Sequence, residues 1–200
     1  VLGFVKSDPQ TGAPTLRFDN LPEIKLGDFD LSKIELPDVS KLTEKLPKWA
    51  YGVNPNGLTI KTLRAGDGAA VFICADGYTM LVGAGSGTGA ALCGQLLLCG
   101  ANHLSAAVAM SSEDEQLGAM KLALGMTKPD YLFVPPTQTK GKAYAQMIDA
   151  AEKRGTRIVS ATQNMAFTLG RARVTFIGPA RTQHTDSRDD GLSLRIDYGG

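Results

Sequence analysis

Residues 69–82 read AAVFICADGYTMLV, and this stretch sets the class of fold. Two runs rich in β-forming residues, 69–75 and 78–82, flank the dipeptide Asp76-Gly77, which is typical of a tight hairpin turn. Just before them, residues 58–63 alternate apolar and polar side chains as a half-buried strand does. The sequence therefore predicts that three neighbouring strands open a sheet.

Beyond this hairpin, strand and helix patterns alternate to the end of the chain. We expect strands at residues 106–110, 131–134, 157–160, 166–169, 172–177 and 192–198. We expect helices at residues 89–98, 115–124 and 143–153, the last of them ended by Gly155. This order of elements implies an α/β fold, a mixed sheet with flanking helices.

Residues 1–56 do not share this pattern and predict a separate segment. The pairs Leu21-Pro22, Leu36-Pro37 and Leu46-Pro47 recur between charged residues, and each proline disfavours helix at the residue before it. We expect either an extended strap along the core surface, with one or two helical turns at residues 38–46, or a linker. The chain starts without a leader sequence, which suggests a fragment of a longer precursor, and its compartment does not follow from it.

The composition is that of a folded globular chain, because 43% of its 200 residues are hydrophobic and 20% are charged. This excludes a disordered tail and a disulfide-linked miniprotein. The 21 basic and 20 acidic residues give a net charge of +1, which creates no global attraction for nucleic acid or an anionic membrane. Glycines, Asn102 and His103 interrupt the longest apolar stretch, residues 78–109, so we expect no membrane span.

The chain offers few nucleophiles or acids in a catalytic pattern. Nucleophilic catalysis needs a serine or cysteine beside a histidine base, and Ser86 in Gly85-Ser86-Gly87 does not fit G-x-S-x-G. We expect small core side chains rather than redox or zinc chemistry for Cys74, Cys93 and Cys99. We expect a solvated polar loop for Asp186, Asp189 and Asp190.

Residues 83–90, GAGSGTGA, follow a predicted strand and match the dinucleotide fingerprint at Gly85, Gly87 and Ala90. Glycines in such a loop let backbone amides approach a pyrophosphate at a helix N-terminus. Glu113 and Asp114 could bind a ribose, but they lie further along the chain than the fingerprint expects. A glycine-rich turn without a ligand is the competing interpretation.

A resemblance to a known family covers more of the chain. Residues 63–73, LRAGDGAAVFI, and 78–85, YTMLVGAG, are similar to the opening of metallo-β-lactamase-fold domains, most closely of the ComEC type, the late-competence DNA-channel proteins and their free-standing relatives. The similarity continues through residues 131–136, 169–179 and 192–198 and rests on pattern rather than on one invariant motif. It implies a metallo-β-lactamase-like mixed sheet holding the N-terminal part of an αββα sandwich, over about residues 57–200.

This chain departs from the family at its metal motif. Where the family carries H-x-H-x-D-H, Ser111 and Glu113 replace the first two histidines, Glu115 replaces the aspartate and Gln116 the last histidine. Gly83 replaces the aspartate of the family's L-I-D-x-G turn. Zinc sites need neutral imidazoles and carboxylates at short, fixed distances. We therefore expect neither the zinc that the resemblance implies nor another cofactor.

Other side chains do not restore such a site. His103 and His184, the two histidines of the chain, lie away from the positions where the family places ligands. Glu113, Asp114 and Glu115 could hold a hard cation through oxygen ligands. We favour a solvated first helical turn over a cation site, because carboxylates there interact favourably with the helix dipole.

In the resembling fold a second half follows the last strand found here. The chain is then either a fragment or a reduced version with one sheet and its helices. In the reduced version an apolar sheet face would need a cover, either residues 1–56 or a second chain. For the second case we expect a homodimer.

Charge is unevenly distributed along the chain, with 9 basic and 13 acidic side chains in residues 1–120 and 12 and 7 in residues 121–200. A phosphate-facing surface, which the competence resemblance implies, would draw on Lys140, Lys142, Lys153, Arg154, Arg157, Arg171, Arg173 and Arg181. Aromatic residues that could stack on bases are nearly absent there, so ordinary surface charge is the competing interpretation.

These observations predict a non-catalytic binding or structural module with a metallo-β-lactamase-like fold. The resemblance implies a link to DNA uptake and an extracytoplasmic or membrane-associated place in a longer precursor. Two alternatives remain. One is a metal-dependent hydrolase or phosphodiesterase of the same family that uses the carboxylates at residues 113–115, and the other is a nucleotide-binding protein that uses residues 85–90.

Overall fold

The computed structural model describes residues 52–66, 68–87, 89–136, 141–179 and 191–199, and the backbone of residues 6–7 and 14–15. The chain forms two compact units, Val1–Glu35 and Leu36–Gly200. In the first unit, β1 (Lys6–Ser7) pairs antiparallel with β2 (Pro14–Thr15). The helical turns expected at residues 38–46 lie outside the described residues, and the strap or linker stays a prediction.

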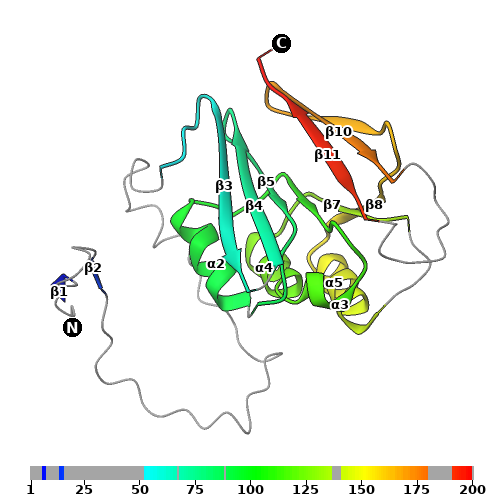
Figure 1. Ribbon diagram of the computed structural model, residues 1–200, viewed down its shortest axis with the longest axis horizontal. Helices are drawn as coiled ribbons and strands as arrows, with labels where there is room; N and C mark the ends of the chain where they lie inside the picture. The colour runs from blue at the N-terminus through cyan, green and yellow to red at the C-terminus, as the bar shows by residue number, and fades with distance from the viewer. Residues whose placement is uncertain are drawn as a thin grey trace, which may run out of the picture. The chain divides into compact units, whose positions relative to one another are not determined.

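The second unit is built on a six-stranded sheet with the strand order β3-β4-β5-β6-β7-β8 (Figure 1). Strands β3 to β5 form an antiparallel meander, and β5 to β8 run parallel. Asp76 and Gly77 form the predicted turn between β4 and β5, with φ angles of 51° and 86°. The strands are β3 (Leu58–Ala65), β4 (Gly68–Ala75), β5 (Tyr78–Val82), β6 (Ala106–Val108), β7 (Tyr131–Val134) and β8 (Arg157–Ser160).

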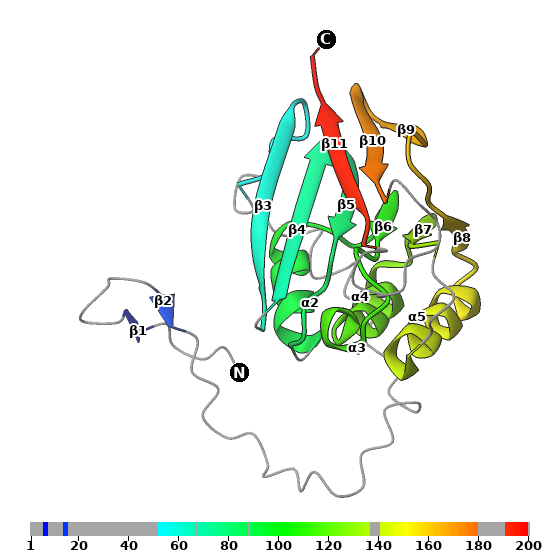
Figure 2. The same cartoon turned by 45° about the vertical axis from the view of Figure 1, so that its right-hand side comes forward.

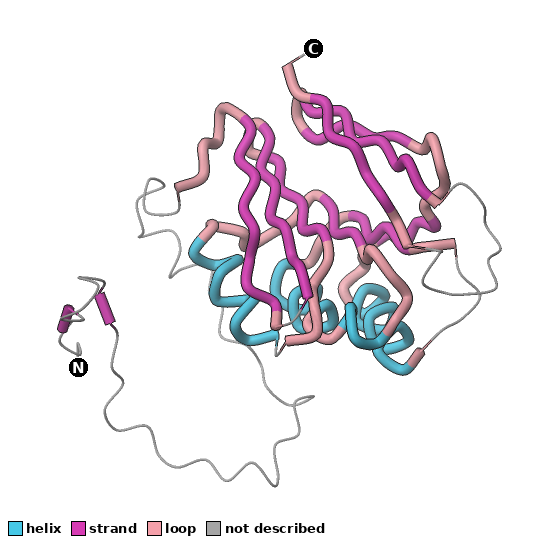
Figure 3. The backbone as a smooth tube through the Cα atoms, in the orientation of Figure 1, coloured by secondary structure: helices cyan, strands magenta, loops and turns pink. Residues whose placement is uncertain are grey.

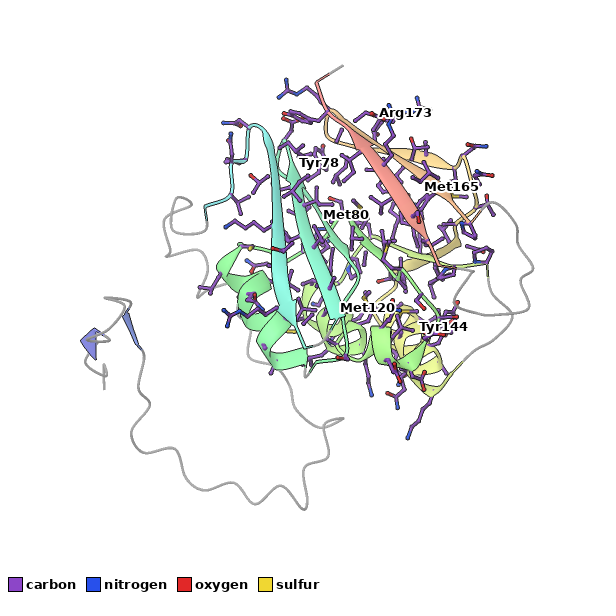
Figure 4. All side chains as sticks on the ribbon, in the orientation of Figure 1. Tyr78, Met80, Met120, Tyr144, Met165 and Arg173 are labelled. Atoms are coloured by element: carbon purple, nitrogen blue, oxygen red, sulfur yellow. The ribbon has the colours of Figure 1, made fainter. Side chains whose placement is uncertain are left out.

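The helices of the second unit cover one face of this sheet (Figure 3). Helix α5 shows why, because Tyr144, Met147 and Ala151 are buried at helical spacing and form one apolar stripe. Met120 and Tyr144 lie on this helix side of the sheet (Figure 4). No helix in the described part has the length and hydropathy that a membrane crossing requires. The helices are α2 (Gly89–Leu98), α3 (Asp114–Leu117), α4 (Met120–Thr127) and α5 (Lys142–Lys153).

A second sheet of three antiparallel strands packs on the opposite face (Figure 2). Its order is β11-β10-β9, from β9 (Ala166–Leu169), β10 (Ala172–Gly178) and β11 (Ser193–Asp197). Phe133 of β7 stacks on Phe167 with ring centroids 4.6 Å apart and meets Phe176 at 5.2 Å. Met80 of β5 lies in this second core (Figure 4). The layers are helices, mixed sheet and second sheet, which confirms the predicted α/β class.

Of the two alternatives, fragment or reduced version, the reduced version with one sheet is wrong, because three further strands of the chain cover the apolar face of β4 to β7. Ile73, Met80, Val108 and Phe133 are buried in one core with side chains of β9 to β11. Sequence patterns predict these three strands, but period-two alternation does not say which sheet a strand joins. Ile60 pairs with Ile73 and so shares its face, yet it remains 55% exposed, so β3 carries an uncovered apolar side chain.

The bounds of the strands and helices predicted for residues 57–200 are confirmed to within two residues, except for one helix. The helix expected at residues 115–124 is divided into α3 and α4 at Gly118 and Ala119. Gly118 lies against the loop before α2, where an added Cβ would come 2.9 Å from the Ser86 carbonyl oxygen. The strand expected at 106–110 ends at Val108, and the Ala109 N–H donates to the Phe133 carbonyl (2.9 Å).

A polar cluster ties the β4–β5 hairpin to the second sheet. The Arg171 side chain donates from Nε and Nη2 to the two oxygens of Asp76 (3.0 and 2.8 Å), and its backbone N–H donates as well (2.9 Å). The Tyr198 hydroxyl donates to Asp76 Oδ1 (2.9 Å). The hydrogen bonds from Arg171 hold the pKa of Asp76 well below its usual range.

Candidate functional site

The parallel strands β5 to β8 end at one edge of the six-stranded sheet, and α/β proteins usually place their sites at this edge. The segments that follow these strands begin at Gly83, Ala109, Pro135 and Ala161. The positions that match the family metal motif, residues 111–116, lie in the segment after β6. This edge is therefore the candidate site.

Ser111 and Ser112 are engaged in the fold of this segment. Both are buried, with 6% and 4% of their surface exposed. The Glu113 N–H donates to Ser111 Oγ (3.1 Å), which closes a short turn before α3. The Ser111 side chain thus stabilises the turn that connects β6 to α3, and Glu113 in this turn is half-buried.

Asp114 reaches another helix. Its Oδ1 accepts a hydrogen bond from the Ala143 N–H (2.9 Å) at the start of α5, 29 residues further along the chain. A Cβ added to Gly141 would collide with this carboxylate. Asp114 therefore caps the N-terminus of α5, an arrangement that sequence reasoning missed. The available signal was Gly141 at the N-cap of α5, since glycine has no side chain to cap its own helix.

Glu115 and Gln116 are exposed on α3, and the Gln116 backbone N–H donates to the Glu113 carbonyl (3.0 Å). The structure thus brings Ser111 and Glu113 into one turn and places the other two motif positions on the helix surface. Next to them, the residue that precedes β11 packs against the end of β6. The Leu192 N–H donates to the Met110 carbonyl (2.7 Å), and Leu192 is 3% exposed.

The residues at this edge do not fit the zinc that the resemblance implies. Ser111 and Asp114 use their oxygens to accept backbone hydrogen bonds, and no imidazole follows β6 in this segment. In the described ranges, no three or more His, Cys, Asp or Glu side chains are grouped so that they could hold a metal ion. His103 lies before β6, at the other end of the strand, with Nε2 3.1 Å from Asp130 Oδ1. His184 lies outside the described residues.

The glycines of the predicted nucleotide loop pack against the chain's own backbone. Gly85 has a φ of +63°, and a Cβ there would collide with the Ala65 carbonyl. The Gly87 N–H donates to that same carbonyl (3.0 Å), and a Cβ on Gly87 would come 2.7 Å from the Gly66 nitrogen. The glycine spacing thus has a structural cause, the close approach of the β3–β4 turn. Ala90 is exposed at the start of α2, and nucleotide binding stays a prediction.

The cysteines contribute to the core. Cys74 and Cys93 are buried and Cys99 is half-buried, and all three are free thiols. Burial raises the pKa of each, that of Cys93 to about 11, so the unreactive thiol form is favoured at neutral pH. Ser86 is exposed, and the acidic residues of the loop 186–190 lie outside the described residues.

Several of the basic residues considered for nucleic acid have protein partners. Lys153 Nζ lies 2.8 Å from Asp149 Oδ2, one turn away on α5. Arg157 donates to the Tyr131 hydroxyl (2.9 Å) and lies over its ring. Arg171 belongs to the Asp76 cluster. Lys140 and Arg181 lie outside the described residues, and nucleic-acid binding stays a prediction.

Comparisons with known proteins give structural neighbours alone. No family model matches the chain, and no curated protein matches it. Among solved structures, it is similar to YhfI, a metallo-β-lactamase-fold protein from Bacillus subtilis, with a TM-score of 0.47, 15% identity, and coverage of 70% of this chain and 57% of that one. It is similar to the MIM-2 metallo-β-lactamase with a TM-score of 0.47, 13% identity, and coverage of 81% and 64%.

A third neighbour is CmlA, a diiron β-hydroxylase from Streptomyces venezuelae, with a TM-score of 0.45, 18% identity, and coverage of 73% of this chain and 28% of that one. The chain therefore spans less than two thirds of the length of each of these three proteins.

Proposed function

We propose that this chain is a non-catalytic binding or structural module with a metallo-β-lactamase-like fold. One observation carries the proposal: the polar groups that follow β6 are used to hold the chain itself. Ser111 accepts from Glu113, Asp114 accepts from α5, and the Met110 carbonyl accepts from Leu192. A hydrolytic metal site would instead need the four motif positions, Ser111, Glu113, Glu115 and Gln116, to present ligands to an ion.

The assignment to the ComEC type is part of the same proposal. It is supported by the sequence similarity of residues 63–73 and 78–85, which cover the end of β3, most of β4, all of β5 and the start of the glycine loop. A role in DNA uptake and a place outside the cytoplasm or at a membrane would follow from that type. The full open reading frame tests this part. Membrane helices beside the segment would support it, and a frame with neither membrane helices nor an export signal would contradict the role in DNA uptake and the place outside the cytoplasm or at a membrane.

The experiment that tests the absence of catalysis is a hydrolysis assay with added metal. The chain would be incubated with bis(4-nitrophenyl) phosphate, and separately with a chromogenic β-lactam, in the presence of Zn²⁺ or Mn²⁺. We expect no turnover above that of the metal and buffer alone. Turnover that disappears in a Glu113→Gln, Glu115→Gln double variant would overturn the proposal and establish the carboxylate-dependent hydrolase instead.

A further inference from the structure

We propose that the segment from Met110 to Asp114 is a structural joint that links β6, β11 and α5. This inference rests on the proposed function, and it names what the segment does at the position where the resembling domains carry their metal motif. Three contacts form the joint: one connects the segment to the start of β11, one forms a turn within the segment, and one connects it to α5.

The first contact joins the two sheets. The Leu192 N–H donates to the Met110 carbonyl (2.7 Å), one residue before β11 begins. Leu192 is 3% exposed and packs with Val82 and Val108 in the core between the sheets. The end of β6 is thus fixed to the start of β11, and a buried leucine lies beside the strand end.

The second contact orients the segment. The Ser111 side chain is buried, and its Oγ accepts the Glu113 N–H (3.1 Å). This turn sets the direction in which α3 leaves the sheet. Asp114, the first residue of α3, is thereby placed next to the start of α5.

The third contact caps α5. This helix has Gly141 at its N-cap, no hydrogen bond from a capping side chain of its own, and no acidic residue in its first turn. Asp114 supplies both missing features from another element, a carboxylate near the positive end of the helix and an acceptor for the Ala143 N–H. Gly141 matches it, because any larger residue would collide with the carboxylate. Asp114 and Gly141 therefore act together as the N-terminal cap of α5.

The test compares Asp114→Ala with a matched control, Glu115→Ala, which removes the same charge from the next residue of α3, and Glu115 has no side-chain hydrogen bond to any of the described residues. We expect Asp114→Ala to lower the folding equilibrium constant about fivefold in urea titrations, as loss of a helix cap does. Amide hydrogen exchange should also become faster at the first turn of α5. Glu115→Ala should leave both measurements unchanged, and Asp114→Asn, which keeps an acceptor oxygen, should restore most of the protection.

Two outcomes would overturn the joint, and they are distinguishable. Equal stability and equal α5 exchange in Asp114→Ala and Glu115→Ala would contradict the joint alone and leave the non-catalytic proposal intact. A rise in thermal stability with added Mn²⁺ or Zn²⁺ that Asp114→Ala abolishes would show that the segment binds an ion. That result would contradict both the joint and the proposed function.

Discussion

Asp76 shows how one side chain can connect two layers. It sits at a position with positive φ in the β4–β5 turn and accepts three hydrogen bonds from Arg171 and one from Tyr198. Arg171 lies between β9 and β10, and Tyr198 follows β11 at the same end of the sheet, so the carboxylate holds this end of the second sheet against the hairpin. Sequence reasoning predicts the turn from Asp76-Gly77 but not these partners, which lie 95 and 122 residues away.

The lowered pKa of Asp76 predicts a pH-dependent stability. Because the folded-state pKa lies below the ordinary carboxyl value of about 4, the stabilisation is present above that pH and is lost as the pH falls below it. In the variant Asp76→Asn, which tolerates the positive φ, this contribution is absent. The difference in unfolding free energy between the wild type and Asp76→Asn should therefore be largest at neutral pH and shrink as the medium becomes acidic.

Denaturant titrations at several pH values measure this difference. Asp149→Asn is the control, since it breaks an exposed pair on α5 that contributes at most about 0.5 kcal/mol. If the difference between the wild type and Asp76→Asn stayed constant across the acidic range, the stabilising role of the ionised Asp76 carboxylate would be contradicted.

The glycine loop shows where prediction from sequence stops. The strand before it, the helix after it and even the bounds of α2 follow from the pattern of residues 78–98. What the glycines face does not follow, because a pyrophosphate and a neighbouring backbone both require the absence of a Cβ. The β3–β4 turn at Gly66 is near in space but seventeen or more residues earlier in the chain. The same limit hid the contact of Gly118 with Ser86, which divides the helix expected at 115–124.

Gly85→Ala should be strongly destabilising, by at least about 2 kcal/mol, because alanine is strained at positive φ and its Cβ would collide with the Ala65 carbonyl. Gly94→Ala is the matched control. Gly94 lies within α2, and an added Cβ would meet nothing within 4 Å, so alanine there should stabilise by up to about 1 kcal/mol. Thermal or denaturant unfolding measures both, and near-wild-type stability of Gly85→Ala would contradict the packing.

The second unit as a whole is a three-layer structure whose outer sheet is integral to it. Alternation in β10 predicts one apolar face, and the structure shows that Ala172, Val174 and Phe176 use it to cover the mixed sheet. Sequence reasoning therefore finds the strands, whereas the assignment of a strand to a sheet depends on contacts such as Phe133 with Phe167. A homodimer stays a prediction, and Ile60 of β3 is an exposed apolar residue that such a contact could bury.

Phe133→Ala tests the coupling of the layers. Phe133 is 6% exposed and meets aromatic rings of both β9 and β10, so its loss should cost about 3–5 kcal/mol. Ile177→Ala, on the opposite face of β10 with half its surface exposed, should change stability by less than about 1 kcal/mol. Unfolding followed by both circular dichroism and scanning calorimetry would reveal separate transitions if the outer sheet were an independent part.

Metal analysis is the most direct test of the proposal that the segment after β6 has a structural role and does not bind a metal ion. The protein would be expressed in medium supplemented with zinc and manganese, purified without chelator and dialysed. Its metal content would then be measured by inductively coupled plasma mass spectrometry. The contacts of Met110, Ser111 and Asp114 predict that only traces of metal remain. Stoichiometric zinc or manganese that survives dialysis and is lost in the Glu113→Gln, Glu115→Gln variant would contradict that role.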